Sequence, residues 1–166
     1  MIRRIGLTGG IASGKSRVAE ILASMLGCVH IDADEICSRL LERGAEGWQE
    51  FSGVFGARYL AEDGSINRSH LRKDLFGDDE FRLKVNSIIH PLVKRAITGQ
   101  MDRIISLEGK SRVIVEVPLL YEVQWENLFD TVVVVYADYD TCLERLMARD
   151  GMGRNSGGWM ERAGGG

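Results

Sequence analysis

The sequence is poor in cysteine, has no long apolar run and carries no excess of basic charge. Its 166 residues include three cysteines, Cys28, Cys37 and Cys142, which form no C-x-x-C pair. This odd, scattered set argues against disulfide pairing, so we expect packed thiols in a reducing, cytoplasmic setting. No stretch approaches the roughly 18 apolar residues of a membrane span, so no membrane partner is expected.

The net charge and the chain length restrict the class of protein further. A net charge of −3 gives no general attraction to nucleic acid, and the composition, 45% hydrophobic and 27% charged, is ordinary. A chain of this length predicts one domain with a real core. It has no N-K-x-D element, which argues against a GTP-reading switch. We expect small-molecule partners and a monomer or weak homo-oligomer.

Residues 9–16, Gly-Gly-Ile-Ala-Ser-Gly-Lys-Ser, fit the phosphate-loop pattern G-x-x-x-x-G-K-S without a mismatch. A strand-like run over 2–8 precedes them, and a helix is predicted after them by the apolar face Val18, Ile21, Leu22 and Met25. Glycines let backbone N–H groups point at phosphate oxygens, and the helix N-terminus adds positive charge. We expect a nucleoside triphosphate here, with Lys15 on its outer phosphates and the Ser16 hydroxyl on Mg²⁺. A glycine-rich turn that binds nothing is the disfavoured alternative.

Strand-like runs alternate with helical ones along the chain, which predicts an α/β fold with a parallel sheet covered by helices. Further strands are expected at 28–31, 112–117 and 131–136, the last buried on both faces because its run is β-branched. Helices are expected near 35–43, 46–54, 68–76, 79–98 and 139–149. Pro91 should kink or split the fourth of these. The mostly helical part from about 40 to 105 is interpreted as an insertion between the second and third strands.

Two acids follow the second predicted strand, in Ile31-Asp32-Ala33-Asp34. Ligands of an open parallel sheet bind beyond the carboxyl ends of its strands, where the phosphate loop also lies. One of these carboxylates could orient an acceptor hydroxyl and take its proton, while another helps to hold Mg²⁺ through water. The alternative, equally open, is that either acid only caps the helix beginning near Glu35.

The last predicted helix carries Arg145 and Arg149, which share one face because they are four residues apart. Near the carboxyl end of the fourth strand, these cations could stabilise charge on a transferring phosphoryl group. The alternative is that this helix face is exposed to solvent and that its arginines pair with Glu144 or Asp150. Asp138, which follows the same strand, is expected to cap rather than to serve as the acid of a motor ATPase.

Six stretches, taken together and in order, resemble the dephospho-coenzyme A kinase family. They are residues 6–16, 31–34, 63–68, 89–92, 117–122 and 144–150, and the resemblance covers residues 1–152. The phosphate loop is generic. The combination of D-A-D at 32–34, H-P-L at 90–92 and P-L-L-Y-E at 118–122 is specific.

The resemblance implies a three-layer α/β/α phosphate-loop kinase that uses ATP and Mg²⁺ to phosphorylate the ribose 3′-hydroxyl of dephospho-CoA. It implies that Asp34 is the base, that Lys15 and Arg145 are also catalytic, and that Ser16 is the metal ligand. The implied ATP contacts are Gly10, Ile11, Ala12, Ser13, Gly14, Lys15, Ser16 and Arg149. The implied acceptor contacts are Asp32, Asp34, His90, Pro118, Leu119, Leu120 and Glu122. For His90 we favour a buried, hydrogen-bonded histidine at the Pro91 kink over direct catalysis.

Two departures from the family pattern bear on the site. Ala12 stands in a variable loop position where glycine is commoner. The family continues past residue 150 with a lid helix, a fifth strand near adenine and a final helix, whereas 151–166 here is rich in glycine. We therefore expect strand order 2-3-1-4 with an apolar edge at strand four, a disordered tail, and impaired adenine binding and lid closure. The open alternatives are another small-molecule, nucleoside or nucleotide kinase, and an inactive nucleotide-binding fragment.

Overall fold

A computed structural model describes residues 3–106 and 112–150 of the chain, and the predicted disorder of 151–166 lies outside them. Four parallel strands form one sheet in the order β2-β3-β1-β4, as the sequence predicts. The strands are β1 (Arg4–Gly9), β2 (Val29–Asp32), β3 (Val113–Glu116) and β4 (Thr131–Val135). In register, Asp32 lies beside Glu116 and Gly9 beside Val135, so the carboxyl ends of all four strands meet at one edge.

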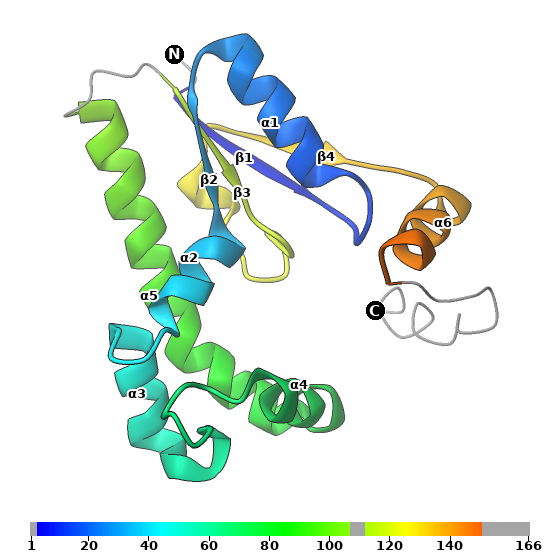
Figure 1. Ribbon diagram of the computed structural model, residues 1–166. Coiled ribbons are helices and arrows are strands. Elements are labelled where there is room, and N and C mark those ends of the chain that lie inside the picture. The colour runs from blue at the N-terminus through cyan, green and yellow to red at the C-terminus, as the bar shows by residue number, and fades with distance from the viewer. Residues whose placement is uncertain (1–2, 107–111, 151–166) are drawn as a thin grey trace.

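Helices cover both faces of the sheet, with α1 on one face and α5 on the other (Figure 1). The helices are α1 (Lys15–Leu26), α2 (Ala33–Leu40), α3 (Glu46–Phe55), α4 (Arg68–Gly77), α5 (Asp79–Ser106) and α6 (Tyr139–Asp150), with 3₁₀ turns η1 (Gly56–Tyr59) and η2 (Glu126–Leu128). None of the helices in this described part of the chain could span a bilayer. Helices α3 and α4 and the first half of α5 lie beyond the carboxyl ends of β2 and β3, where the acceptor of an α/β enzyme binds.

Helix α5 runs through Pro91 as one 28-residue element, so the alternative that Pro91 splits the helix is wrong, and a kink there stays a prediction. Proline removes one backbone hydrogen bond, yet buried side chains on both sides of it, Ile89 and Ile97 among them, hold the two halves in one core. The same cluster continues from Phe51 in the helical insertion to Val115 in the sheet. The insertion and the sheet therefore share a single hydrophobic core.

Helix α1 buries only part of the predicted apolar face, since Val18 and Leu22 are partly buried and pack against the core under the helix. Ala19 and Ala23 are buried against the sheet, whereas Ile21 and Met25 are 45% and 76% exposed. The small alanine side chains let the helix lie close to β1 and β3, and a pattern of large apolar residues does not indicate them. On β4 the predicted burial of both faces is also wrong. Val134 is 57% exposed, because β4 is an edge strand among the described residues.

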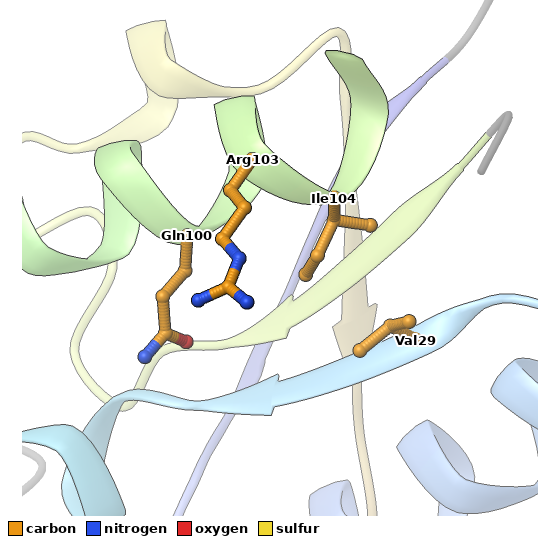
Figure 2. A pocket seen from close by; sticks show the side chains of 4 residues that line it. All are labelled: Val29, Gln100, Arg103 and Ile104. Atoms are coloured by element: carbon orange, nitrogen blue, oxygen red, sulfur yellow. The ribbon is translucent and has the colours of Figure 1, made fainter. Parts of the chain in front are cut away.

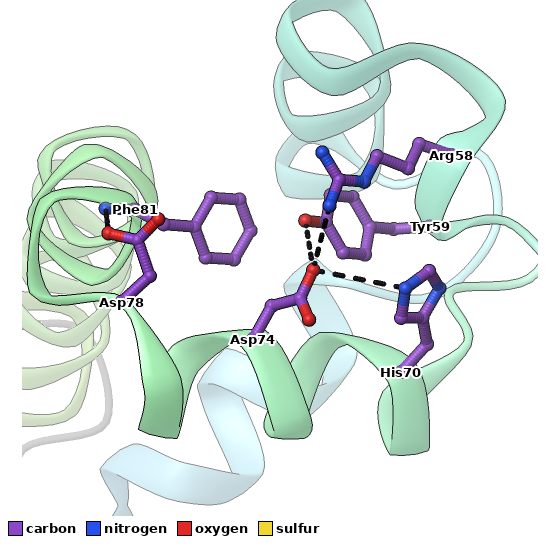
Figure 3. Close-up of polar contacts among 6 residues, drawn as sticks. All are labelled: Arg58, Tyr59, His70, Asp74, Asp78 and Phe81. Atoms are coloured by element: carbon purple, nitrogen blue, oxygen red, sulfur yellow. Dashed lines mark hydrogen bonds and ion pairs between the residues drawn. The ribbon is translucent and has the colours of Figure 1, made fainter.

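A polar cluster ties η1 to α4 at the far end of the insertion (Figure 3). One oxygen of Asp74, Oδ2, accepts the Tyr59 hydroxyl at 2.7 Å and an Arg58 N–H at 3.1 Å, and lies 3.8 Å from His70 Nε2. The Tyr59 ring is buried and stacks on Phe81, with 5.1 Å between ring centroids. The cluster fixes the shape of the insertion and lies apart from the phosphate loop.

We expect Tyr59→Phe to lower stability at neutral pH and to lose less stability than wild type on acidification. The hydrogen bond from Tyr59 is the main influence that lowers the pKa of Asp74. A carboxylate with a lowered folded-state pKa stabilises the fold above its ordinary value of about 3.9, and that stability is lost as the pH falls through the folded-state value. Urea denaturation at about pH 5 and about pH 2 should show the difference narrowing with acidity. Tyr121→Phe, at an exposed tyrosine, is the matched control.

Candidate active site

The phosphate loop joins β1 to α1 through two glycines in left-handed backbone conformations. Gly14 has φ 95° and caps α1, so the first N–H groups of that helix open onto the loop. Gly9 has φ 154°, and a Cβ atom there would lie 2.2 Å from the carbonyl oxygen of Val135. The sequence motif therefore forms the predicted loop between a strand and a helix N-terminus, and β4 packs directly against its first residue.

Ala12 is held at φ 57°, in the left-handed region, so it is strained despite its variable position in the motif. This conformation costs a non-glycine residue about 1–2 kcal/mol. Glycine would relieve the strain but lose about 0.4–1 kcal/mol through its freer unfolded chain. We expect Ala12→Gly to raise the free energy of unfolding by about 0.5–1 kcal/mol, measured by urea denaturation. Ala61→Gly, at a loop position outside the positive-φ set, should lower it instead.

Two cationic side chains lie over the phosphate loop. Lys15 Nζ donates a 2.9 Å hydrogen bond to the carbonyl oxygen of Gly10. Arg145 reaches across from α6 and donates to the carbonyl oxygens of Ala12 and Ser13 at 3.3 and 3.1 Å. Arg145 is therefore part of the loop's surroundings rather than of a separate solvated face, and Arg149 lies in the last turn of the same helix.

Glu116, the last residue of β3, is a site residue that the sequence interpretation missed. Its Oε1 accepts a 2.9 Å hydrogen bond from the Ser16 hydroxyl, and the residue is only 4% exposed. Its Oε2 has no hydrogen-bond partner among the described residues. The signal for it in the sequence is a single acid closing the apolar run Val113-Ile114-Val115, the same pattern that Asp138 has after its strand.

Asp138 caps α6, as expected from the sequence. Its Oδ1 accepts the Thr141 N–H at 2.9 Å, and its Oδ2 accepts the Thr141 hydroxyl at 2.8 Å. These bonds lower the pKa of Asp138 and fix the start of the helix that carries Arg145.

The two acids of the D-A-D segment have different roles in α2: Asp32 caps the helix, and Asp34 lies in its first turn. Asp32 Oδ1 accepts the N–H groups of Asp34 and Glu35 at 2.8 and 3.3 Å and so caps α2. Asp34 lies in the first turn of α2, and its pKa is raised, first by burial and then by the negative charges of Asp32 and Glu116. Lys15 acts in the opposite direction. The capping alternative thus holds for Asp32 and leaves Asp34 as the candidate proton acceptor.

The P-L-L-Y-E segment forms the turn after β3, beside these acids. Leu119 is 61% exposed and strained at φ 55°, and Pro118 and Glu122 also have exposed surface. Leu120 is fully buried in the main core, so the expectation that it contacts the acceptor is wrong in this structure. Leu120 is the buried residue of this segment and anchors the exposed Leu119 beside it.

His90 is half-buried and packs edge-to-face on the buried Trp125, with 5.9 Å between ring centroids. Burial lowers the pKa of His90 and favours the neutral ring. The contact joins α5 to the end of the turn after β3. This supports the structural role that we favour for His90, with an aromatic contact in place of the expected hydrogen bond.

Two cavities lie along α5, away from these groups. One, of about 270 Å³, is lined by Val29, Gln100, Arg103 and Ile104 (Figure 2). The other, of about 290 Å³, is lined by Ile36, Arg39, Leu40, Ala45, Ala96 and Gln100. Neither includes a phosphate-loop residue, so neither is part of the candidate site at the phosphate loop.

A parallel sheet, a phosphate loop opening α1, and acids closing the neighbouring strands together define a phosphate-loop kinase. The particular family is shown by the family model described as dephospho-CoA kinase, which matches residues 3–158. The chain belongs to the dephospho-CoA kinase family, a family of phosphotransferases.

Known proteins agree with this assignment. A dephospho-CoA kinase of Shouchella clausii is 40% identical over 149 residues, which are 90% of this chain and 75% of the relative. A Thermus thermophilus crystal structure is 31% identical with a TM-score of 0.80, covering 98% of this chain and 80% of that one. The Campylobacter jejuni dephospho-CoA kinase is also 31% identical, with a TM-score of 0.63 and coverages of 92% and 75%.

Proposed function

We propose that this chain transfers the γ-phosphoryl group of ATP to the ribose 3′-hydroxyl of dephospho-CoA. The observation that carries the proposal is Asp34, a carboxylate of raised pKa beside the phosphate-loop lysine, in a chain of the dephospho-CoA kinase family. A carboxylate whose pKa is raised is a stronger proton acceptor than an ordinary one.

In the proposed reaction, Asp34 accepts the proton of the 3′-hydroxyl as its oxygen bonds to the γ-phosphorus. The bond from that phosphorus to the β–γ bridging oxygen breaks, and ADP leaves. Lys15 and the loop N–H groups stabilise the outer phosphates of ATP. Arg145, held at the loop by the carbonyl groups of Ala12 and Ser13, stabilises charge on the transferring group. Pro118, Leu119 and Glu122 offer their exposed surfaces to the acceptor.

The oxygen donors at the site fit Mg²⁺. The Ser16 hydroxyl donates to Glu116, so its oxygen lone pairs are available to a hard cation, and the buried carboxylate adds negative charge behind it. No group of three or more histidine, cysteine or acidic side chains in residues 3–106 and 112–150 could hold a metal ion. That agrees with Mg²⁺, which takes one or two protein ligands and completes its shell with phosphates and water. When bound, the ion would neutralise charge between the β- and γ-phosphates.

The function is tested by ADP release with dephospho-CoA against a panel of nucleoside, nucleotide and sugar acceptors. We expect dephospho-CoA to be preferred and the product to match coenzyme A rather than its 2′-phosphate isomer in chromatography and mass spectrometry. Preference for another acceptor would replace the proposed substrate. ATP binding without transfer to any acceptor would favour an inactive nucleotide-binding protein.

Impaired adenine binding stays a prediction of the sequence. In the part of the chain described, β4 is an edge strand. Calorimetric titration with ATP and with inorganic triphosphate separates the adenine contribution from that of the phosphates. Much tighter binding of ATP than of triphosphate, together with rapid turnover, would contradict the prediction.

A further inference from the structure

His30 lies beside Glu116 on the side of the sheet that α1 covers. β2 and β3 run in register with His30 opposite Ile114 and Asp32 opposite Glu116. Side chains two residues apart on a strand share a face, and Ile114 packs in the core under α1. The two side chains meet diagonally, with His30 Nε2 3.4 Å from Glu116 Oε2.

Each of these two buried atoms lacks a hydrogen-bond partner among the described residues, and each is placed to become the partner of the other. A buried polar atom without a partner is costly and rare in folded proteins. A small shift of either side chain would shorten the 3.4 Å separation of these atoms to that of a good N–H···O hydrogen bond. The other oxygen of Glu116 is already occupied, because it accepts the Ser16 hydroxyl.

We propose that His30 is a positioning residue for Mg²⁺, donating its Nε2–H to Glu116 Oε2 and thereby aligning Glu116 toward Ser16. With one oxygen held by His30, the carboxylate keeps its other oxygen on the Ser16 proton. The lone pairs of the Ser16 oxygen then stay directed at the cation. This inference rests on the proposed function in one respect, the assignment of Mg²⁺ to Ser16.

Calorimetric titration with ATP, with and without Mg²⁺, tests the inference in wild type, His30→Leu and His30→Gln. Leucine removes the donor, and glutamine places an N–H near the position of Nε2. We expect similar metal-free ATP affinity in all three proteins. The gain in affinity from Mg²⁺ should fall about tenfold in His30→Leu, as for other groups that orient metal ligands, and should largely recover in His30→Gln.

The outcomes test the proposed metal site and the proposed role of His30 separately. A wild-type protein that gains no affinity from Mg²⁺ contradicts the proposed metal site itself. A normal gain in wild type that is equal in His30→Leu overturns only the role of His30. If the affinity gain from Mg²⁺ falls equally in His30→Leu and His30→Gln, the role of His30 is also overturned. Glutamine keeps an N–H donor, so loss of the donor could not explain the fall in that variant.

A second measurement needs no substitution at His30 and so does not depend on the variants folding. In wild-type protein labelled with ¹⁵N-histidine, long-range ¹H–¹⁵N spectra report which ring nitrogens carry protons. The chain has three histidines, so substitutions of His70 and His90 assign the signals. We expect a proton on Nε2 of His30. An unprotonated Nε2 would overturn the inference.

Discussion

Asp34→Asn should lower kcat with dephospho-CoA by about 10²–10⁴-fold, the usual contribution of a positioned general base. Asparagine keeps the size and the helix position of Asp34 but cannot accept the hydroxyl proton. The KM for ATP should stay close to the wild-type value, because the phosphate loop is unchanged. ADP release measured by a coupled assay gives both constants.

Two further variants make this result specific. Glu35→Gln removes the neighbouring exposed acid in the same turn of α2 and should leave kcat unchanged. Asp32→Asn retains an oxygen that can cap α2 but removes a negative charge that raises the pKa of Asp34. The acid limb of the kcat–pH profile should therefore move to lower pH in Asp32→Asn. Equal rates for wild type and Asp34→Asn would eliminate Asp34 as the base.

Gly9→Ala should reduce the free energy of unfolding by about 2–4 kcal/mol, a large share of the stability of an ordinary domain. The added Cβ would lie 2.2 Å from the carbonyl oxygen of Val135 and 3.0 Å from Ser13 Oγ. The first of these is a backbone atom in a paired strand, so it cannot turn aside as a flexible side chain could. The β1–β4 pair must separate, and the phosphate loop begins at that point, so ATP binding should fail as well.

Gly10→Ala is the matched control, one residue along the same loop. A Cβ at Gly10 would meet no atom within 4 Å, and Gly10 is not among the positive-φ glycines. Its free energy of unfolding should stay within about 0.5 kcal/mol of wild type in urea denaturation. A Gly9→Ala protein as stable as Gly10→Ala would contradict the close packing of β4 on the loop.

The strands and the place of the phosphate loop could be predicted from sequence because local patterns encode them, whereas the order of the strands followed from the family resemblance. The glycines at 9 and 14 permit backbone conformations that other residues rarely adopt, and the β-branched runs mark the strands. The two roles of Asp32 and Asp34 could not be separated in this way. Both acids suit a cap, and only the backbone geometry at the start of α2 selects Asp32.

The pairing of Ser16 with Glu116 depends on residues 100 positions apart, and no spacing rule joins them. The sheet register creates that contact. The buried face of α1 could be predicted only in part for a related reason, since how closely a helix approaches a sheet depends on both surfaces. Leu120 was misplaced because a turn has no fixed period that tells which of its side chains point inward.

Helix α5 has a consequence for how the protein moves and unfolds. At about 1.5 Å per residue, its 28 residues form a rod of about 42 Å that is embedded in the sheet at one end and in the insertion at the other. The two regions therefore cannot swing as separate rigid bodies on a loop hinge. Any opening toward the acceptor must come from bending of this rod or from sliding of α3 and α4 along it. Unfolding should follow one cooperative transition. A destabilising substitution at Tyr59 would therefore lower the denaturation midpoint of the phosphate loop as well.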